Sequence, residues 1–155
     1  MVKLNEAIPA FSVEATSGQT ITQESLKGQN TVIYFYPKDN TPGCTTEGQE
    51  FRDAIEAFKA ANTVIYGVSK DSLRTHENFK TKQCFPFELI SDSDESFCKL
   101  FDVIKLKKLY GKEYMGIDRS TFLINSSGVL VREWRGVKVK GHVAEVLTAA
   151  QSLKS

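Results

Sequence analysis

The chain has 155 residues, enough for a sizeable hydrophobic core, and we expect residues 1–155 to form a single domain. Its 20 basic and 19 acidic side chains leave a net charge of +1, which excludes the strongly basic balance typical of nucleic-acid-binding proteins. With no apolar stretch near the ~18 residues of a membrane helix, no secretory signal and three widely spaced cysteines, we expect a cytoplasmic protein without a membrane or nucleic-acid partner.

Predicted strands and helices alternate through the first part of the chain, and a hairpin and a helix close it. In the first part of the chain we expect strands at 8–14 and 20–21, a helical turn at 23–27, a strand at 31–36 and a helix from 42 to about 58. A strand at 63–68, a helix that is capped by 71–72 and runs to about 82, a strand at 87–90 and a helix at 92–101 follow. Strands at 121–124 and 129–134 and a helix from about 142 complete the chain. This order predicts an α/β layer architecture, in which the hairpin around Ser17–Gly18 covers one edge of the sheet. The basic segment that contains Lys105, Lys107, Lys108, Tyr110 and Lys112 is predicted to be a solvated loop.

The stretch around Cys44 predicts a reactive thiol. Thr41 and Pro42 are typical of a helix start, and the Thr41 hydroxyl can cap the helix by accepting the backbone N–H of Cys44. Cys44 then lies in the first turn, among unpaired N–H groups at the positive end of the helix dipole, which favours the thiolate form.

An apolar stripe begins at Cys44 and predicts where its sulfur lies. Cys44, Gly48, Phe51, Ile55 and Phe58 recur at steps of four and three residues, which is one face of a helix. The sulfur should therefore lie at the bottom of a recess against the preceding strand. An ordinary buried cysteine is the alternative, but the cap, the proline and the first-turn position together favour a functional residue.

The residues of this stretch resemble a known family. Pro37-x-x-x-Thr41-x-x-Cys44 resembles the active-site motif of the peroxiredoxins, and the string from Tyr34 to Glu47 is similar to their bacterioferritin-comigratory (BCP/PrxQ) branch. The segment 116–124 is similar to the one that carries the catalytic arginine of that family, here Arg119. The likeness also includes 91–95 and 137–142, and so covers nearly the whole chain.

The resemblance implies a thioredoxin fold, with a central mixed sheet flanked by helices and an N-terminal β-hairpin extension. It also implies a thiol peroxidase that reduces hydrogen peroxide and small organic hydroperoxides, in which Cys44 becomes a sulfenic acid. Thr41 and Arg119 would position the peroxide and stabilise charge, and Pro37 would shield the thiol from water. No cofactor or metal is implied, and thioredoxin or a glutaredoxin-type donor would supply electrons. We expect a monomer that serves antioxidant defence.

The other two cysteines have different interpretations. Many members of the branch carry a resolving cysteine five residues after the reactive one, where this chain has Gln49, or on the next helix, where it has Lys80. Cys84 lies one turn further along, at a helix end before Phe85–Pro86, and either a resolving or a structural role is open for it. Cys98, between two phenylalanines, is expected in the core.

Other functions and other ligands are less well supported by the sequence. A dithiol oxidoreductase is disfavoured because Thr41 and Glu47 occupy both positions where a Cys-x-x-Cys partner would fall. A cysteine hydrolase would need His142 within hydrogen-bond distance of Cys44, and a binding or holdase module would have kept the fold without catalysis. His76 and His142 show no metal-ligand spacing, and we expect surface or capping histidines.

Overall fold

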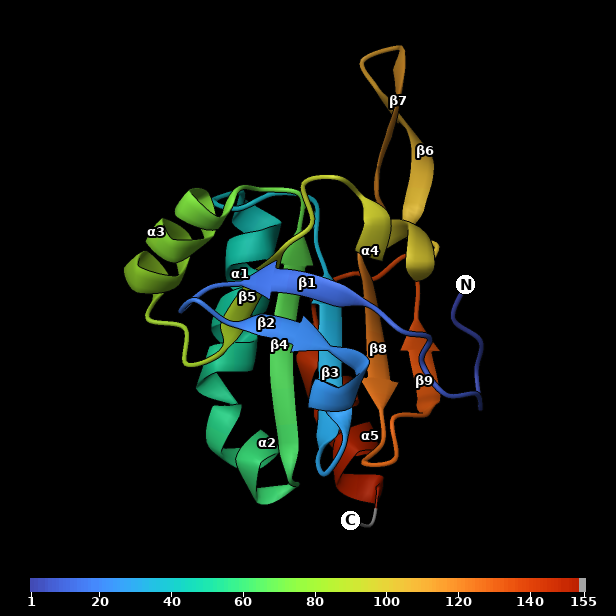
Figure 1. Ribbon diagram of the computed structural model, residues 1–155. Helices are drawn as coiled ribbons and strands as arrows, with labels where there is room; N and C mark the ends of the chain where they lie inside the picture. The colour runs from blue at the N-terminus through green and yellow to red at the C-terminus, as the bar shows by residue number, and fades with distance from the viewer. Residues whose placement is uncertain (154–155) are drawn as a thin grey trace.

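The computed structural model describes residues 1–153 as an α/β structure built around a mixed sheet (Figure 1). Its elements are β1 (Ser12–Ala15), β2 (Thr20–Thr22), the 3-10 helix η1 (Gln23–Leu26), β3 (Asn30–Phe35), α1 (Pro42–Asp53), α2 (Ile55–Ala60), β4 (Thr63–Ser69), α3 (Leu73–Gln83), β5 (Glu88–Ser91), α4 (Ser96–Leu100), β6 (Ile104–Leu109), β7 (Lys112–Ile117), β8 (Ser120–Ile124), β9 (Leu130–Trp134) and α5 (His142–Ser152). Within the described part of the chain, no helix is both long and apolar enough to cross a membrane.

The main sheet has seven strands in the order β2-β1-β5-β4-β3-β8-β9. β3, β4 and β5 run parallel, whereas β8, β9 and the β1–β2 hairpin add antiparallel strands at the two sides. β3 lies between β4 and β8, and all six of its residues are buried. The mixed sheet and the hairpin at its edge therefore agree with the predicted architecture.

Side chains that alternate along the strands form two cores, one on each face of the sheet. On one face, Val32, Tyr34 and Leu123 pack against apolar side chains of α1, α2, α3 and α5. On the other, Ile33 and Phe35 pack against α4, η1 and the β1–β2 hairpin, which crosses in front of the sheet in Figure 1. Because the two cores hold the sheet from both sides, the C-terminal end of β3 is a rigid support for the residues that follow it.

Three predicted elements have different bounds from those expected. The helix expected at 92–101 spans only Ser96–Leu100. The first strand begins at Ser12 rather than at residue 8, although Ala7 forms an isolated bridge with Val129. The predicted helix from 42 to about 58 is interrupted at Ala54, whose φ of −97° and ψ of 6° end α1 before α2 begins. The apolar stripe survives this interruption, since Phe51 and Phe58 still pack with ring centroids 5.8 Å apart.

The prediction of a solvated loop at 105–112 is wrong. These residues form the β6–β7 hairpin, which pairs strand to strand from Ile104–Ile117 to Leu109–Lys112 and projects from the body of the molecule (Figure 1). Its two-residue loop, Tyr110–Gly111, has positive φ at both positions (50° and 77°), as tight hairpin turns require. The frequent lysines hid the strand alternation in the sequence.

Candidate active site around Cys44

Cys44 lies in the first turn of α1, directly beyond the C-terminal end of β3. The backbone N–H of Tyr36 donates to Val68 O at 3.0 Å, which continues the pairing of β3 and β4 by one residue. The chain then turns through Pro37, which is half-buried, and reaches the helix at Pro42. Cys44 is the third helical residue and is buried, with 2% of its surface exposed. The predicted strand, turn and helix start are thus all present.

The capping bond predicted for Thr41 is wrong. Thr41 has the extended backbone of an N-cap residue (φ −86°, ψ 152°), but its hydroxyl makes no capping hydrogen bond. The hydroxyl instead donates to Lys38 O at 2.7 Å, because the preceding turn brings that carbonyl within reach. The backbone N–H of Cys44 is therefore left without the Thr41 cap.

Arg119 reaches Cys44 from a segment 75 residues further along the chain. It lies between β7 and β8, and its carbonyl accepts the N–H of Val137 at 2.9 Å, which holds the backbone in place. Its Nη2 donates to Cys44 Sγ at 3.3 Å, and a Cβ added at Gly43 would lie 3.2 Å from the same Nη2. A small residue at position 43 thus keeps the guanidinium close to the sulfur.

Glu47 is the residue of this site that the sequence interpretation missed. Its side chain is fully buried, and Arg119 Nη1 donates to its Oε1 at 2.6 Å, so one guanidinium contacts both Glu47 and Cys44. Oε2 has no hydrogen-bond partner among the described residues. Burial raises the pKa of Glu47 to about 7, although Arg119 acts in the opposite direction. A signal was available: Glu47 is three residues after Cys44, on the same apolar helix face.

A second buried network holds the turn that precedes the site, and it shows that the expected surface position of His76 is wrong. Asp39 accepts the Tyr36 hydroxyl at 2.6 Å through Oδ1 and contacts His76 Nδ1 at 2.6 Å through Oδ2. His76 Nε2 lies 3.0 Å from Ile90 O, and its side chain is completely buried. His76 is buried because α3 packs this part of its surface against the end of the sheet.

The same network contains a group of potential metal ligands. Asp39, Asp71 and His76 each offer a ligand atom within 4.8 Å of the others. Asp71 Oδ2 already accepts the backbone N–H of Asp39 at 2.9 Å and the Ser69 hydroxyl, and Asp39 Oδ2 faces the His76 ring. These hydrogen bonds explain why the three side chains lie together: they join the turn before α1 to α3.

His142 is also buried rather than on the surface. Its Nε2 lies 2.7 Å from the Thr121 hydroxyl, and its ring packs edge-on against Trp134 with centroids 5.8 Å apart. Burial lowers the pKa of His142 to about 4, so the ring is neutral near neutral pH. Among the described residues its hydrogen bond goes to Thr121 and not to Cys44, and the geometry required by a cysteine hydrolase is not formed.

The other two cysteines lie in different environments. Cys98 is fully buried, as predicted, and burial raises its pKa. Cys84 is exposed and ends α3 in the left-handed conformation (φ 57°). The end of α3 is joined to α1 by Gln83, whose side chain accepts from Gln49 and whose carbonyl accepts from Arg52, both at 2.9 Å. Cys44 and Cys84 are both free thiols.

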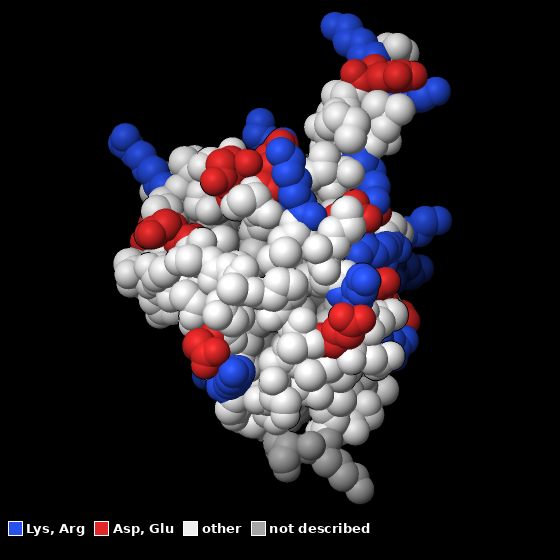
Figure 2. Space-filling view, turned by 45° about the vertical axis from the view of Figure 1, so that its right-hand side comes forward, with Lys and Arg blue, Asp and Glu red and all other residues white. Residues whose placement is uncertain are grey.

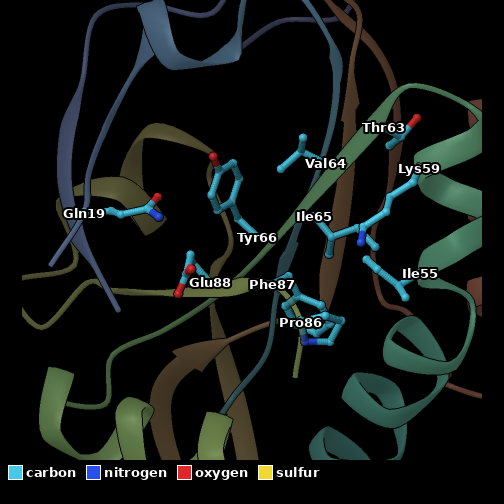
Figure 3. A pocket seen from close by; sticks show the side chains of 10 residues that line it. All are labelled: Gln19, Ile55, Lys59, Thr63, Val64, Ile65, Tyr66, Pro86, Phe87 and Glu88. Atoms are coloured by element: carbon cyan, nitrogen blue, oxygen red, sulfur yellow. The ribbon is translucent and has the colours of Figure 1, made fainter. Parts of the chain in front are cut away.

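The surface has two hollows of interest, one beside α1 and one beside β4. A hollow of about 360 Å³ between α1 and residues 139–141 is lined by Pro42, Gly43 and Thr46, and Cys44 is not among its lining residues. Another, of about 220 Å³, lies beside the first half of β4, where Tyr66 and Glu88 border it on one side and Ile55 and Lys59 on the other (Figure 3). None of the residues predicted for catalysis lines this second hollow.

Comparisons with known proteins cover almost the whole chain. Residues 4–133 match the AhpC/TSA family. The chain is 50% identical over 153 residues to Peroxiredoxin Bcp of Bacillus subtilis (99% of this chain and 96% of the relative) and 50% identical over 152 residues to Peroxiredoxin Bcp of Xanthomonas campestris (98% and 95%).

Solved structures agree with these matches. The chain superposes on the bacterioferritin comigratory protein of Xanthomonas campestris, studied for its alkyl peroxide reduction activity, with a TM-score of 0.87 and 48% identity over 92% of this chain and 90% of the other. It superposes on PrxQ of Xylella fastidiosa with a TM-score of 0.91 and 41% identity, over 98% and 97% of the two chains.

Proposed function

This chain belongs to the AhpC/TSA family as a peroxiredoxin of the Bcp (PrxQ) type, and we propose that Cys44 is the thiol with which it reduces peroxides. It is accordingly a thiol-dependent peroxidase with a thioredoxin fold, and reduction of hydrogen peroxide and small organic hydroperoxides passes through a cysteine sulfenic acid. The observation that carries the assignment to Cys44 is its first-turn position with the Arg119 guanidinium 3.3 Å from its sulfur.

The proposed reaction begins with attack of the Cys44 thiolate on one peroxide oxygen. The S–O bond forms as the O–O bond breaks, and the leaving hydroxide or alkoxide takes a proton to become water or an alcohol. Arg119 is suited to stabilise the charge that moves from sulfur to oxygen, because its planar guanidinium presents several donors. Its ion pair with the buried Glu47, at 2.6 Å, holds the guanidinium in that orientation.

Two further residues are proposed to position the peroxide. The Thr41 hydroxyl gives its proton to Lys38 O, so its lone pairs are free to accept the O–H of a bound peroxide. Pro37 lies half-buried between β3 and α1, where a ring without an N–H donor helps to exclude water from the thiol. Both roles follow the motif shared with the family, and both are compatible with these positions.

For the return to the thiol, we propose reduction by thioredoxin or a glutaredoxin-type donor, with Cys84 as a candidate resolving cysteine. Cys84 is exposed, and its left-handed backbone is strained for a residue other than glycine, which favours unwinding of the last turn of α3. A disulfide with the buried Cys44 would also require the first turn of α1 to unwind. If that movement does not occur, the external thiol reduces the sulfenic acid directly.

Three broader expectations accompany this function. We propose that residues 1–155 act as one domain, since both cores share the same sheet. A reducing compartment such as the cytoplasm would keep Cys44, Cys84 and Cys98 as free thiols. We further propose that the protein acts as a monomer.

Rapid mixing of the reduced protein with one equivalent of hydrogen peroxide tests the assignment. The wild-type protein should gain a sulfenic acid on Cys44, seen by quenching at successive times and measuring the mass of the Cys44 peptide. Cys44→Ser should not consume peroxide, whereas Cys98→Ser, which changes a buried cysteine outside the site, should react as the wild type does if it remains folded. If Cys44→Ser consumed hydrogen peroxide at the wild-type rate, the proposal would be overturned.

A further inference from the structure

The β6–β7 hairpin carries an unusual share of the exposed apolar surface. Of nine large hydrophobic side chains that are exposed in the described part of the chain, five lie in this one segment: Leu106, Leu109, Tyr110, Tyr114 and Met115. Tyr110, at the tip, is 95% exposed. Scattered single apolar residues need no explanation, but such a concentration on one projecting element indicates an interaction site.

These side chains extend from both faces of the hairpin and from its tip. Leu106 and Met115 are cross-strand partners on one face, whereas Leu109 and Tyr114 lie at alternate positions and so project from the opposite face. A flat protein surface would cover one face and leave the other in water. A hairpin that is apolar on both faces and at its end instead fits a medium that surrounds it, such as the headgroup region of a lipid bilayer.

The charge of the hairpin is complementary to an anionic lipid surface. Lys105, Lys107, Lys108 and Lys112 against a single Glu113 give it a net charge of +3, so the remainder of the chain carries −2. Figure 2 shows basic side chains on the projecting hairpin at upper right, with uncharged atoms between them. Lysines beside tyrosine and aliphatic residues are the composition that interfacial segments use, because a lysine stem can lie along apolar surface while its ammonium meets phosphate.

We propose that the β6–β7 hairpin docks this protein on anionic lipid surfaces. The strands have six residues each, about 20 Å of extended chain, and their outer edges carry backbone groups that need water or headgroups as partners. Docking is therefore shallow, with Tyr110 and its apolar neighbours at the level of the headgroups. The expectation of no membrane partner rested on apolar spans, and a shallow hairpin requires none.

The proposal stands independently of the assignment of Cys44, although it places that site near the lipid. Arg119 follows the end of β7 by two residues, and Lys107 on β6 is half-buried beside the base of the hairpin. When the hairpin is docked, the distance between the Cys44 site and the bilayer surface is therefore about the length of the hairpin.

Vesicle flotation with the reduced full-length protein tests the proposal. The probes are vesicles of phosphatidylcholine alone and vesicles of phosphatidylcholine mixed with phosphatidylglycerol, at low and high salt. The wild type should float with the anionic vesicles only, and salt should release it, since surface charges are screened. Lys108→Gln/Lys112→Gln should bind the anionic vesicles roughly 30-fold more weakly than the wild type. Each lysine near the surface contributes about a fivefold gain in affinity, and the variant loses two. Lys59→Gln/Lys82→Gln, with the same net charge, should bind as the wild type does.

The apolar contribution has its own matched pair. Leu109→Ser/Tyr110→Ser should lose flotation, whereas Val64→Ser/Leu73→Ser, which changes exposed apolar side chains elsewhere, should retain it. All four double variants should react with hydrogen peroxide at the wild-type rate, which confirms that they fold. Absence of flotation by the wild type, or equal flotation by hairpin and control variants, would overturn the proposal. So would a wild-type dimer that Leu109→Ser/Tyr110→Ser converts to monomer, because the hairpin would then join two copies of this chain.

Discussion

Glu47→Gln is expected to remove a dependence of stability on pH that the wild-type protein carries. Burial raises the pKa of Glu47 from 4.5 to about 7 in the folded protein. Because the folded state binds this proton more tightly than the unfolded chain, the associated stabilisation is complete below pH 4.5 and is lost as pH rises through 7. At about 1.4 kcal/mol per pKa unit, the loss between about pH 5 and about pH 8 is roughly 2–3 kcal/mol. Glutamine keeps an acceptor for Arg119 and never ionises, so the variant should not show this loss.

Urea unfolding at several pH values, with thiols kept reduced and ionic strength fixed, measures the effect. The difference in free energy of unfolding between wild type and Glu47→Gln is the quantity to plot, since groups common to both, such as the buried His142, cancel in it. Repeating the pair in a Cys44→Ser background removes the other acid that contacts Arg119. A wild-type-minus-variant difference that stays constant from about pH 5 to about pH 8 would refute the argument that burial raises the pKa of Glu47 in the folded protein.

Three other substitutions test the site and its surroundings. Arg119→Ala should slow peroxide reduction by a factor of hundreds, from a loss of ~2.7–4 kcal/mol in transition-state stabilisation, and Arg119→Lys should recover little; near-normal stopped-flow rates in a folded alanine variant would make Arg119 dispensable. After one equivalent of peroxide, Cys84→Ser should accumulate sulfenic and sulfinic acid at Cys44, whereas the wild type should yield a Cys44–Cys84 linked peptide; identical peptide masses in both would assign resolution to an external thiol. Gly48→Ala should lower the urea midpoint, because its Cβ would overlap the Phe85 ring at a cost of about 1–3 kcal/mol, more than the gain of ~1 kcal/mol in helix propensity; an unchanged midpoint would mean that the ring moves aside freely.

Patterns among neighbouring residues were sufficient to predict the strand and the helix start that position Cys44. The apolar run at 31–36 predicted β3 to within a residue, and Thr41–Pro42 predicted the start of α1, so the first-turn position of Cys44 followed from the sequence. Each of these features depends on neighbours along the chain, through backbone sterics and periodicity. The stripe through Phe51 likewise predicted which face of α1 is buried.

The sequence was less informative wherever a polar group could choose between partners. The sequence predicts that Thr41 caps α1, but its hydroxyl donates to the Lys38 carbonyl instead. The turn from Lys38 to Thr41 brings that carbonyl within reach, and a local pattern does not predict this choice of partner. The lysines of the β6–β7 hairpin break the apolar alternation, so the sequence pattern favours a loop there, whereas its strands pair with each other rather than with the main sheet. Local pattern is a weak guide for an element that buries little apolar surface.

Only the tertiary structure decided which buried polar groups meet. The apolar pattern predicts that a face is covered, but not which charged side chain a distant segment brings to it. Arg119 meets Cys44 and Glu47 across more than 70 residues, and His76 meets Asp39 across 37. A charged group enters the interior only where an opposite charge or a hydrogen-bond partner offsets its desolvation, and that partner is selected when the sheet and its helices pack together.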